Sequence, residues 1–246
     1  DDPRLKSYFS AAQDGRDNDG NITQTVAGVK QLTSIEGKFK GVRQGTGVGD
    51  NRYSTHSRTT ITTSSKIIVM AAAEVWFLRA EAALRGFTSE DVESCYKQGV
   101  TTSFAQWDAS GVSEYLESEN TPADYVDTFD KNFDAKATTS ITPKWDNTAD
   151  NETKLERIIT QKWLAIYPEG CEAWAEQRRT GYPKLFKVVV NNSSNAISTD
   201  DMIRRVFFNQ DYITNNKPLY DALVSKLGGL DTGGTRLWWD TGKNNF

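Results

Sequence analysis

The sequence predicts a mainly α-helical fold in which helical hairpins pack together, with long loops and minor short strands. Residues 66–107 and 152–179 carry apolar side chains at helical spacing. Residues 13–65 are instead rich in Gly, Ser, Thr and Asn and poor in apolar residues, which is typical of loops. We therefore expect one domain over residues 1–246. Its parts are a loop-rich segment (13–65), a helical hairpin (66–107), a helical region (111–183) and a tail (184–246).

Composition excludes several classes of protein. The chain has 246 residues and a net charge of −4, and its mean hydropathy is −0.61. A nucleic-acid partner would demand a basic stripe, which is missing. No run of about 18 apolar residues offers a membrane span. The first residues, Asp-Asp-Pro-Arg-Leu-Lys, do not form a signal peptide and look like the middle of a longer protein.

The first half is expected to hold one strong helical hairpin. A short helix is predicted over residues 1–12, and short strands are predicted at 33–35 and 59–62. An Ala-rich helix follows over 66–84 and ends at Gly86. Thr88 with Asp91 then forms a capping pattern for a second helix, which runs to about Trp107. The pair is similar to one tetratricopeptide unit, and because such arrays usually need about three units, partner units are expected before this chain.

The second half is expected to hold a further helix pair. Short helices are predicted near 115–116 and 123–129, followed by a loop over 138–150. An apolar stripe then predicts a helix that ends at Pro168, and a second helix ends at Gly181. In the tail, a strand is predicted at 184–190 and a helix at 219–227. The tryptophans on helical apolar faces are assigned to packing: Trp76, Trp107, Trp163 and Trp174.

Material for catalysis is scarce, so we expect no enzyme and no cofactor. His56 is the sole histidine, and no nucleophile, zinc or phosphate-binding motif occurs. Two carboxylate pairs on helices could in principle cleave a glycosidic bond. They are Glu74 with Glu81 and Glu172 with Glu176, and ordinary ion pairs with neighbouring arginines explain them better.

One loop has the oxygen-rich pattern of a calcium site. Asp17, Asp19 and Asn21 alternate and surround a glycine, as in a calcium-binding loop. Gly15 occupies the first ligand position and Val26 the position of the bidentate glutamate, so a complete EF-hand is excluded. An irregular calcium turn stays open. Cys95 and Cys171 are expected to be small, buried helical thiols, with a single bridge between them left open.

Aromatic residues supply the best material for binding. Rings in loops are more often exposed than rings on helices, and Tyr53, Trp145 and Tyr182 lie in predicted loops. We place the ligand surface on residues 37–58, with Tyr53 as the stacking ring. Arg43, Arg52 and His56 would donate hydrogen bonds, Trp145 would be a second platform, and Tyr182 a further contact. The alternative is that this loop packs on an N-terminal half of the protein that precedes this chain.

One long motif has a specific resemblance. Residues 161–183 read QKWLAIYPEGCEAWAEQRRTGYP, and the chain also contains DPRL near its start, AEVWFLRAEAALRG at 73–86, KWDN at 144–147 and TRLWWD at 235–240. In this order they resemble the SusD-like (SusD/RagB-type) family of outer-membrane, nutrient-capturing lipoproteins. Members carry a lipoprotein signal and more tetratricopeptide-like helices ahead of this region. The resemblance therefore identifies the chain as a C-terminal portion.

The resemblance implies a fold and a function. The fold would be an α/α superhelical domain of tetratricopeptide-like hairpins. The protein would be a non-catalytic binder at the cell surface, held to the outer membrane only through a lipid anchor outside this chain. It would capture oligosaccharides or similar nutrients and deliver them to a TonB-dependent (SusC-like) transporter. In the alternative to ligand binding, residues 37–58 would pack on this transporter or on the N-terminal half. Two other classes stay open, a helical-repeat scaffold that binds only proteins and, less favoured, a glycoside hydrolase.

Overall fold

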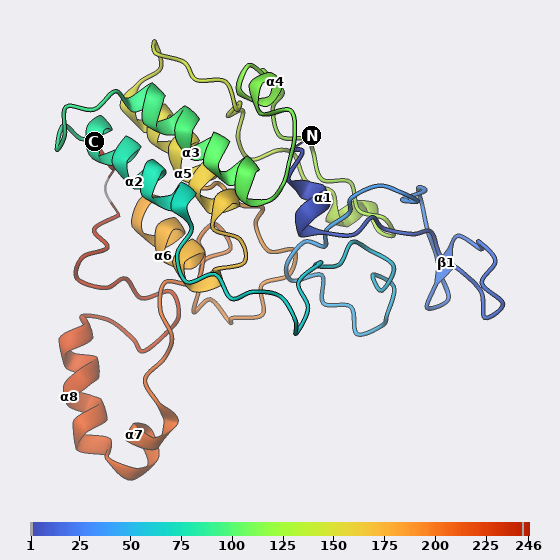
Figure 1. The fold of residues 1–246 in the computed structure, drawn as a ribbon. Coiled ribbons are helices and arrows are strands. Elements are labelled where there is room, and N and C mark those ends of the chain that lie inside the picture. Colours follow the sequence, from blue (N-terminus) through green and yellow to red (C-terminus); the bar gives the residue numbers. More distant parts are fainter. Residues whose placement is uncertain (1, 243) are drawn as a thin grey trace.

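The computed structural model describes residues 2–242 and 244–246, and it confirms the mainly helical fold. Figure 1 shows a layer of long helices with extended loops on either side. The helices are α1 (Leu5–Tyr8), α2 (Ala72–Leu84), α3 (Val92–Gln106), α4 (Val112–Leu116), η1 (Lys131–Phe133), α5 (Asn151–Ala165), α6 (Gly170–Thr180), α7 (Gln210–Asn215) and α8 (Lys217–Leu227). Two short strands, β1 (Thr25–Val26) and β2 (Val29–Lys30), form a small antiparallel ribbon.

The core lies between α2, α3 and α5. α2 and α3 form a hairpin, and α5 packs against both (Figure 1). A Cβ atom at Gly99 of α3 would lie 2.8 Å from the ring of Phe77 on α2, so glycine is what allows the two helices to approach so closely. The predicted packing of the two helical stretches is therefore confirmed. The innermost apolar side chains are Ala73, Phe77, Ala80, Tyr96, Val100, Phe104, Leu155, Ile158 and Ile159.

Polar caps fix where the long helices begin and end. Asp91 accepts a hydrogen bond from the backbone N–H of Ser94 at 2.8 Å and so opens α3. Asp91 itself is the N-cap, so the predicted capping role of Thr88 is wrong. Gly181 closes α6 with a φ of 80°, in the left-handed region that glycine favours.

Several predicted elements are absent or shorter. Residues 66–71 are not helical, and Ile67 and Val69 are each 90% exposed, because this stretch lies outside the hairpin and finds no core to pack on. The predicted helix over 1–12 is limited to the four residues of α1. Residues 33–35, 59–62 and 184–190 form no named strand, and residues 123–129 are extended rather than helical.

The tail forms a separate lobe and then returns to the core. α7 and α8 project away from the helical layer (Figure 1), and neither helix contains a buried residue. An ion pair between Arg205 and Asp231, both buried, holds the base of the lobe. Near the C-terminus, the Asn245 side chain donates hydrogen bonds to Glu152 and to the carbonyl of Thr180. Within the described residues, no helix is both long and apolar enough to cross a membrane.

Candidate functional site

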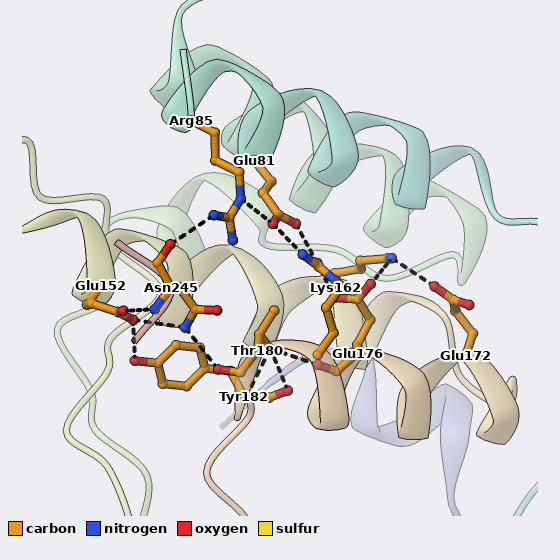
Figure 2. Close-up of polar contacts among 10 residues, drawn as sticks. Glu81, Arg85, Glu152, Lys162, Glu172, Glu176, Thr180, Tyr182 and Asn245 are labelled. Carbon is orange, nitrogen blue, oxygen red and sulfur yellow. Dashed lines mark hydrogen bonds and ion pairs between the residues drawn. The ribbon is translucent and has the colours of Figure 1, made fainter. Parts of the chain in front are cut away.

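The centre of the long sequence motif is a buried lysine. Lys162 on α5 is 1% exposed, and its Nζ lies 2.9 Å from Glu176 and 3.1 Å from Glu172, both on α6. Glu74 of α2 lies at 3.4 Å. Figure 2 shows Glu172 and Glu176 converging on this lysine. Burial alone would lower the pKa of Lys162, but the charge and hydrogen bond of Glu176 outweigh it and raise that pKa. The motif thus joins three helices through one cation.

A second cation extends this network to the other end of α2. Arg179 donates to both carboxylate oxygens of Glu81 at 2.6 Å and to Glu176 at 2.7 Å. Arg85 also donates to Glu81 (Figure 2). Burial by itself would raise the pKa of Glu81, yet the two arginines outweigh it and lower that pKa. The Glu81 carboxylate is therefore charged, and each of its two oxygens accepts a hydrogen bond from an arginine.

The DPRL motif near the start of the chain is also built into the interior. Arg4 is fully buried, pairs with Asp2 and donates to Ser103 and Gln161 on α3 and α5. Its guanidinium lies 5.0 Å from the ring centre of Phe104. The charged residues of the motifs that carry the family resemblance thus form the frame of the molecule.

Both carboxylate pairs considered for glycoside hydrolysis belong to this frame. Glu172 and Glu176 share Lys162 as a partner, Glu74 lies beside the same lysine, and Glu81 is bound by two arginines. A general acid must hold a proton, and such cationic partners favour the charged carboxylate instead. The surroundings of these groups suit structural ion pairs.

An open cleft lies beside α6. Its volume is about 1340 Å³, and its walls come from residues 41–44, the α5–α6 pair, residues 184–193 and residues 197–203, with Tyr125 and Thr138 also in the lining. The loop that contains residues 41–44 and the loop at 184–193 are joined by backbone hydrogen bonds from the Val189 N–H to Gln44 and from the Val190 N–H to Gly45, each 2.9 Å. The cleft is large enough for several sugar rings, given that ligand sites commonly span about 300–1,000 Å³.

Four aromatic rings line the cleft. Trp163 and Trp174 are half-buried, so the expectation that they belong to the core is wrong. The core-facing positions of their helices are taken by smaller side chains, which leaves these two rings at the edge. Phe186 is 37% exposed, and its ring lies 5.9 Å from that of Tyr125. Of the other tryptophans assigned to packing, Trp76 and Trp107 are half-buried against the core and against Tyr8 respectively.

Two of the predicted ligand residues, Tyr53 and His56, form one cluster, and neither is among the residues that line the cleft. The Tyr53 hydroxyl donates to Asp127, and its ring packs edge-on against Phe129 at 5.4 Å. His56 is 4% exposed, and its Nε2 lies 2.8 Å from the hydroxyl of Thr128. Desolvation lowers the pKa of His56. Arg52 is paired with Asp50. The contacts of Tyr53 and His56 thus bind the loop at 37–58 to residues 127–129.

The other predicted ligand residues are scattered. Arg43 lines the cleft, but its guanidinium donates to the carbonyls of Phe133 and Lys187 at 2.7 Å each. Trp145 is 8% exposed and packs against Tyr96 in the core, so the expectation of an exposed ring there is wrong. Its loop folds back over α3, which buries the ring. Tyr182 donates to Glu152 at 3.0 Å (Figure 2).

A buried carboxylate connects the loop cluster to the cleft. Asp127 is 1% exposed and accepts hydrogen bonds from the hydroxyls of Tyr53 and Tyr125, at 3.1 and 3.0 Å. Burial and the charge of Asp127 raise the pKa of both tyrosines. Sequence reasoning missed Asp127 and Tyr125, because residues 123–129 read as a helix. The only local sign of this pair in the sequence is that an aromatic residue, Tyr125, stands two positions before an acidic residue, Asp127.

The proposed calcium turn is closed by its own hydrogen bonds. One oxygen of Asp17 accepts from the backbone of Asp19 and Asn21, and the other accepts from the Asn21 side chain at 3.1 Å. Among the described residues, no three His, Cys, Asp or Glu side chains gather to hold a metal ion. Calcium binding here stays a prediction. Both cysteines are free, and Cys171 is exposed rather than buried, which removes the bridge left open above.

Comparison with known protein families identifies the family of this chain. A family model described as "SusD-like: Susd and RagB outer membrane lipoprotein" matches residues 1–240. The chain belongs to this SusD-like family. The family is one of outer membrane lipoproteins, so the predicted outer-membrane location is confirmed at the level of the family. A comparison with curated proteins gives no match.

Solved SusD homologues share the fold of this SusD-like chain. One from Bacteroides vulgatus is 46% identical with a TM-score of 0.85, and the match covers 100% of this chain and 47% of that one. A chitin-binding homologue from Flavobacterium johnsoniae is 40% identical with a TM-score of 0.86, covering 100% and 48%. A third, from Bacteroides thetaiotaomicron, is 35% identical with a TM-score of 0.82, covering 99% and 49%. This chain thus spans about half the length of these relatives.

Proposed function

We propose that this SusD-like protein captures oligosaccharides at the outer surface of the cell and passes them to a TonB-dependent transporter. Membership of an outer membrane lipoprotein family supports the location, and a chitin-binding homologue at 40% identity supports a glycan as cargo. The observation that carries the proposal in this chain is the open cleft with four aromatic rings. Such rings can stack on the apolar faces of sugars, while polar neighbours bind the hydroxyls.

The cleft offers the polar groups that a sugar needs. Gln44 and Gln177 come from different segments of the lining, and neither side chain hydrogen-bonds to any described residue. The Oε1 atom of Gln177 is buried without a partner, which costs free energy, and a turn of this side chain toward the cleft would bring the atom to a ligand hydroxyl. Asn192 adds a third amide. A few such contacts give an affinity on the order of micromolar to millimolar, which suits a protein that releases its cargo.

The same geometry supports binding without catalysis. The carboxylates on the helices are engaged by buried cations, and the two acids that line the cleft, Asp200 and Asp201, are paired with Lys187 and Arg204. Inverting and retaining glycosidases need one free carboxylic acid beside one free carboxylate. We therefore expect bound oligosaccharides to leave the protein intact.

Calorimetry and product analysis on the same samples test this proposal. The intact protein is titrated with chitin-, cellulose- and starch-derived oligosaccharides, and each mixture is then analysed for shortened products. We expect saturable binding of at least one class and no shortening of any chain. Hydrolysis would contradict the non-catalytic part.

The transporter is tested separately by co-purification of the full-length protein from detergent-solubilised outer membranes. We expect a TonB-dependent transporter to co-purify with it. A protein that binds the transporter but none of the glycans would be a scaffold of the kind considered above, and the glycan proposal would then be wrong.

A further inference from the structure

Every described charged side chain that lines the cleft already has an ion-pair or hydrogen-bond partner within the protein. Among the described residues, five charged side chains line it: Arg43, Lys184, Lys187, Asp200 and Asp201. Lys184 pairs with Glu156 at 2.8 Å, and Lys187 pairs with Asp200. The guanidinium of Arg43 is occupied by backbone carbonyls.

The remaining acid is neutralised by two arginines. Asp201 pairs with Arg204 at 2.5 Å and with Arg236 at 3.4 Å. Both arginines also contact Asp240, so they carry no spare charge toward the cleft. Of the three lining cations, Lys184 and Lys187 are thus matched by Glu156 and Asp200, whereas Arg43 has backbone carbonyls as its partners.

The side chains left free in the cleft are uncharged. Gln44, Gln177 and Asn192 present amides that have no hydrogen-bond partner among the described residues, and Phe186 presents an exposed ring edge. An anionic sugar would have to displace Asp200 from Lys187, Glu156 from Lys184 or the backbone carbonyls from Arg43 to gain an ion pair. A cationic sugar would meet a second cation beside each acid. In both cases the internal interaction that is lost offsets the one that the sugar gains, whereas a neutral hydroxyl or amide can bind without displacing any internal partner.

From this arrangement we infer that the cleft selects neutral oligosaccharides over acidic and amino sugars. The inference rests on the proposed glycan-binding function and adds its charge specificity. Its basis is that each charged lining side chain already has partners within the protein, whereas the free groups of the lining are amides and aromatic rings. The ligand class is therefore an uncharged glycan, with or without N-acetyl groups.

The test compares three probes of matched length on the intact protein: N-acetylated chitin oligosaccharide, its deacetylated cationic form, and oligogalacturonate as the anion. Each affinity is measured at low salt and at about 1 M NaCl, where the Debye length falls to about 3 Å. We expect the neutral probe to bind at least about tenfold more tightly than either charged probe. Its affinity should hardly change with salt. A second neutral series, from starch, is measured beside it so that the result does not depend on one sugar.

Two variants connect the result to the ion pairs. Asp200→Asn releases Lys187, and one freed charge at close range should raise oligogalacturonate affinity about fivefold at low salt. The gain is read as the ratio of the oligogalacturonate affinity to the neutral affinity, both measured on the same variant. Asp221→Asn breaks the similarly exposed pair with Lys217 on α8, outside the cleft, and should leave all affinities as they are.

The outcomes separate the two proposals. A charged probe that binds as tightly as the neutral ones, with strong salt dependence, overturns the charge inference and leaves glycan binding intact. No gain for oligogalacturonate in Asp200→Asn also counts against it, because the pair then does not control charge. If no probe of any charge binds, both the proposed function and this inference are wrong.

Discussion

Lys162 on α5 and Glu176 on α6 form an ion pair of 2.9 Å in which the lysine side chain is 1% and the glutamate 6% exposed. Both residues belong to the stretch by which the chain resembles its family. An ion pair this deeply buried is costly to break, because the remaining partner has no water to replace the lost one. The most recognisable part of the sequence therefore secures the helical frame, and the cleft takes its walls largely from less distinctive loops.

Replacing Lys162 with Met should lower the free energy of unfolding of the protein. The change removes the buried cation shared by Glu74, Glu172 and Glu176 and leaves Glu176 with Arg179 alone. Removing one partner of a buried pair costs about 3–5 kcal/mol. Urea unfolding at neutral pH measures this loss. Lys97→Met removes an exposed pair with Glu93 on α3 and should cost no more than about 0.5 kcal/mol. Equal losses of unfolding free energy in the two variants would mean that Lys162 does not stabilise the contact between α2, α5 and α6.

Stability should fall in acid partly through Glu81. Its pKa in the folded protein lies below the usual 4.5. Its contribution is therefore complete above pH 4.5 and is lost as the pH falls through the lowered pKa. The free energy of unfolding of Glu81→Gln should be below that of the native protein at pH 7, and the gap should shrink below pH 4.5. Glu119→Gln, at an exposed pair, serves as the control. A gap independent of pH would contradict the pairing.

Trp145→Ala should damage the fold and spare ligand binding. The ring is 8% exposed and packs against Tyr96, so its removal leaves a core cavity that costs about 3–5 kcal/mol. Thermal or urea unfolding measures the loss, and calorimetry on the fraction that stays folded measures ligand affinity. A stable variant that has lost binding would restore Trp145 as an exposed platform.

Tyr53 and Tyr125 should be coupled through Asp127. Each hydroxyl donates to this buried carboxylate, and a hydrogen bond to a charged acceptor contributes about 1.5–3 kcal/mol. A double-mutant cycle with Tyr53→Phe and Tyr125→Phe should therefore give losses that do not add, because the second change leaves Asp127 with backbone donors only. Strict additivity in urea unfolding would mean that the two tyrosines do not share the acid.

Apolar periodicity predicted the long helices because their burial follows a simple rule. Leu155, Ile158 and Ile159 lie one turn apart and all face the core. The same rule fails at residues 66–71, where apolar residues continue the pattern but find no neighbouring element. It fails again at Lys162, because lysine is among the residues that are least often buried. The buried position of Lys162 is explained only by its three carboxylate partners, which are distant in sequence.

The cleft could not be predicted from local patterns. Its walls are separated by more than a hundred residues, and they meet only because residues 188–190 hydrogen-bond to the loop near Gln44. Loop position was taken to indicate exposure, yet Trp145 is buried and Trp163, on a helix, borders the cleft. Exposure of a ring depends on what folds over it, and that is a property of the whole chain.

The most direct test of glycan capture in the cleft compares Phe186→Ala with Phe87→Ala in the intact protein. Both residues are exposed phenylalanines, but only Phe186 lines the cleft. Calorimetric titration with the tightest-binding neutral oligosaccharide should show about a tenfold loss of affinity for Phe186→Ala, as removal of one stacking ring is worth roughly 1–3 kcal/mol in other systems. Phe87→Ala should bind like the native protein. Native affinity in Phe186→Ala, with the fold unchanged, would contradict the assignment of the cleft as the binding site.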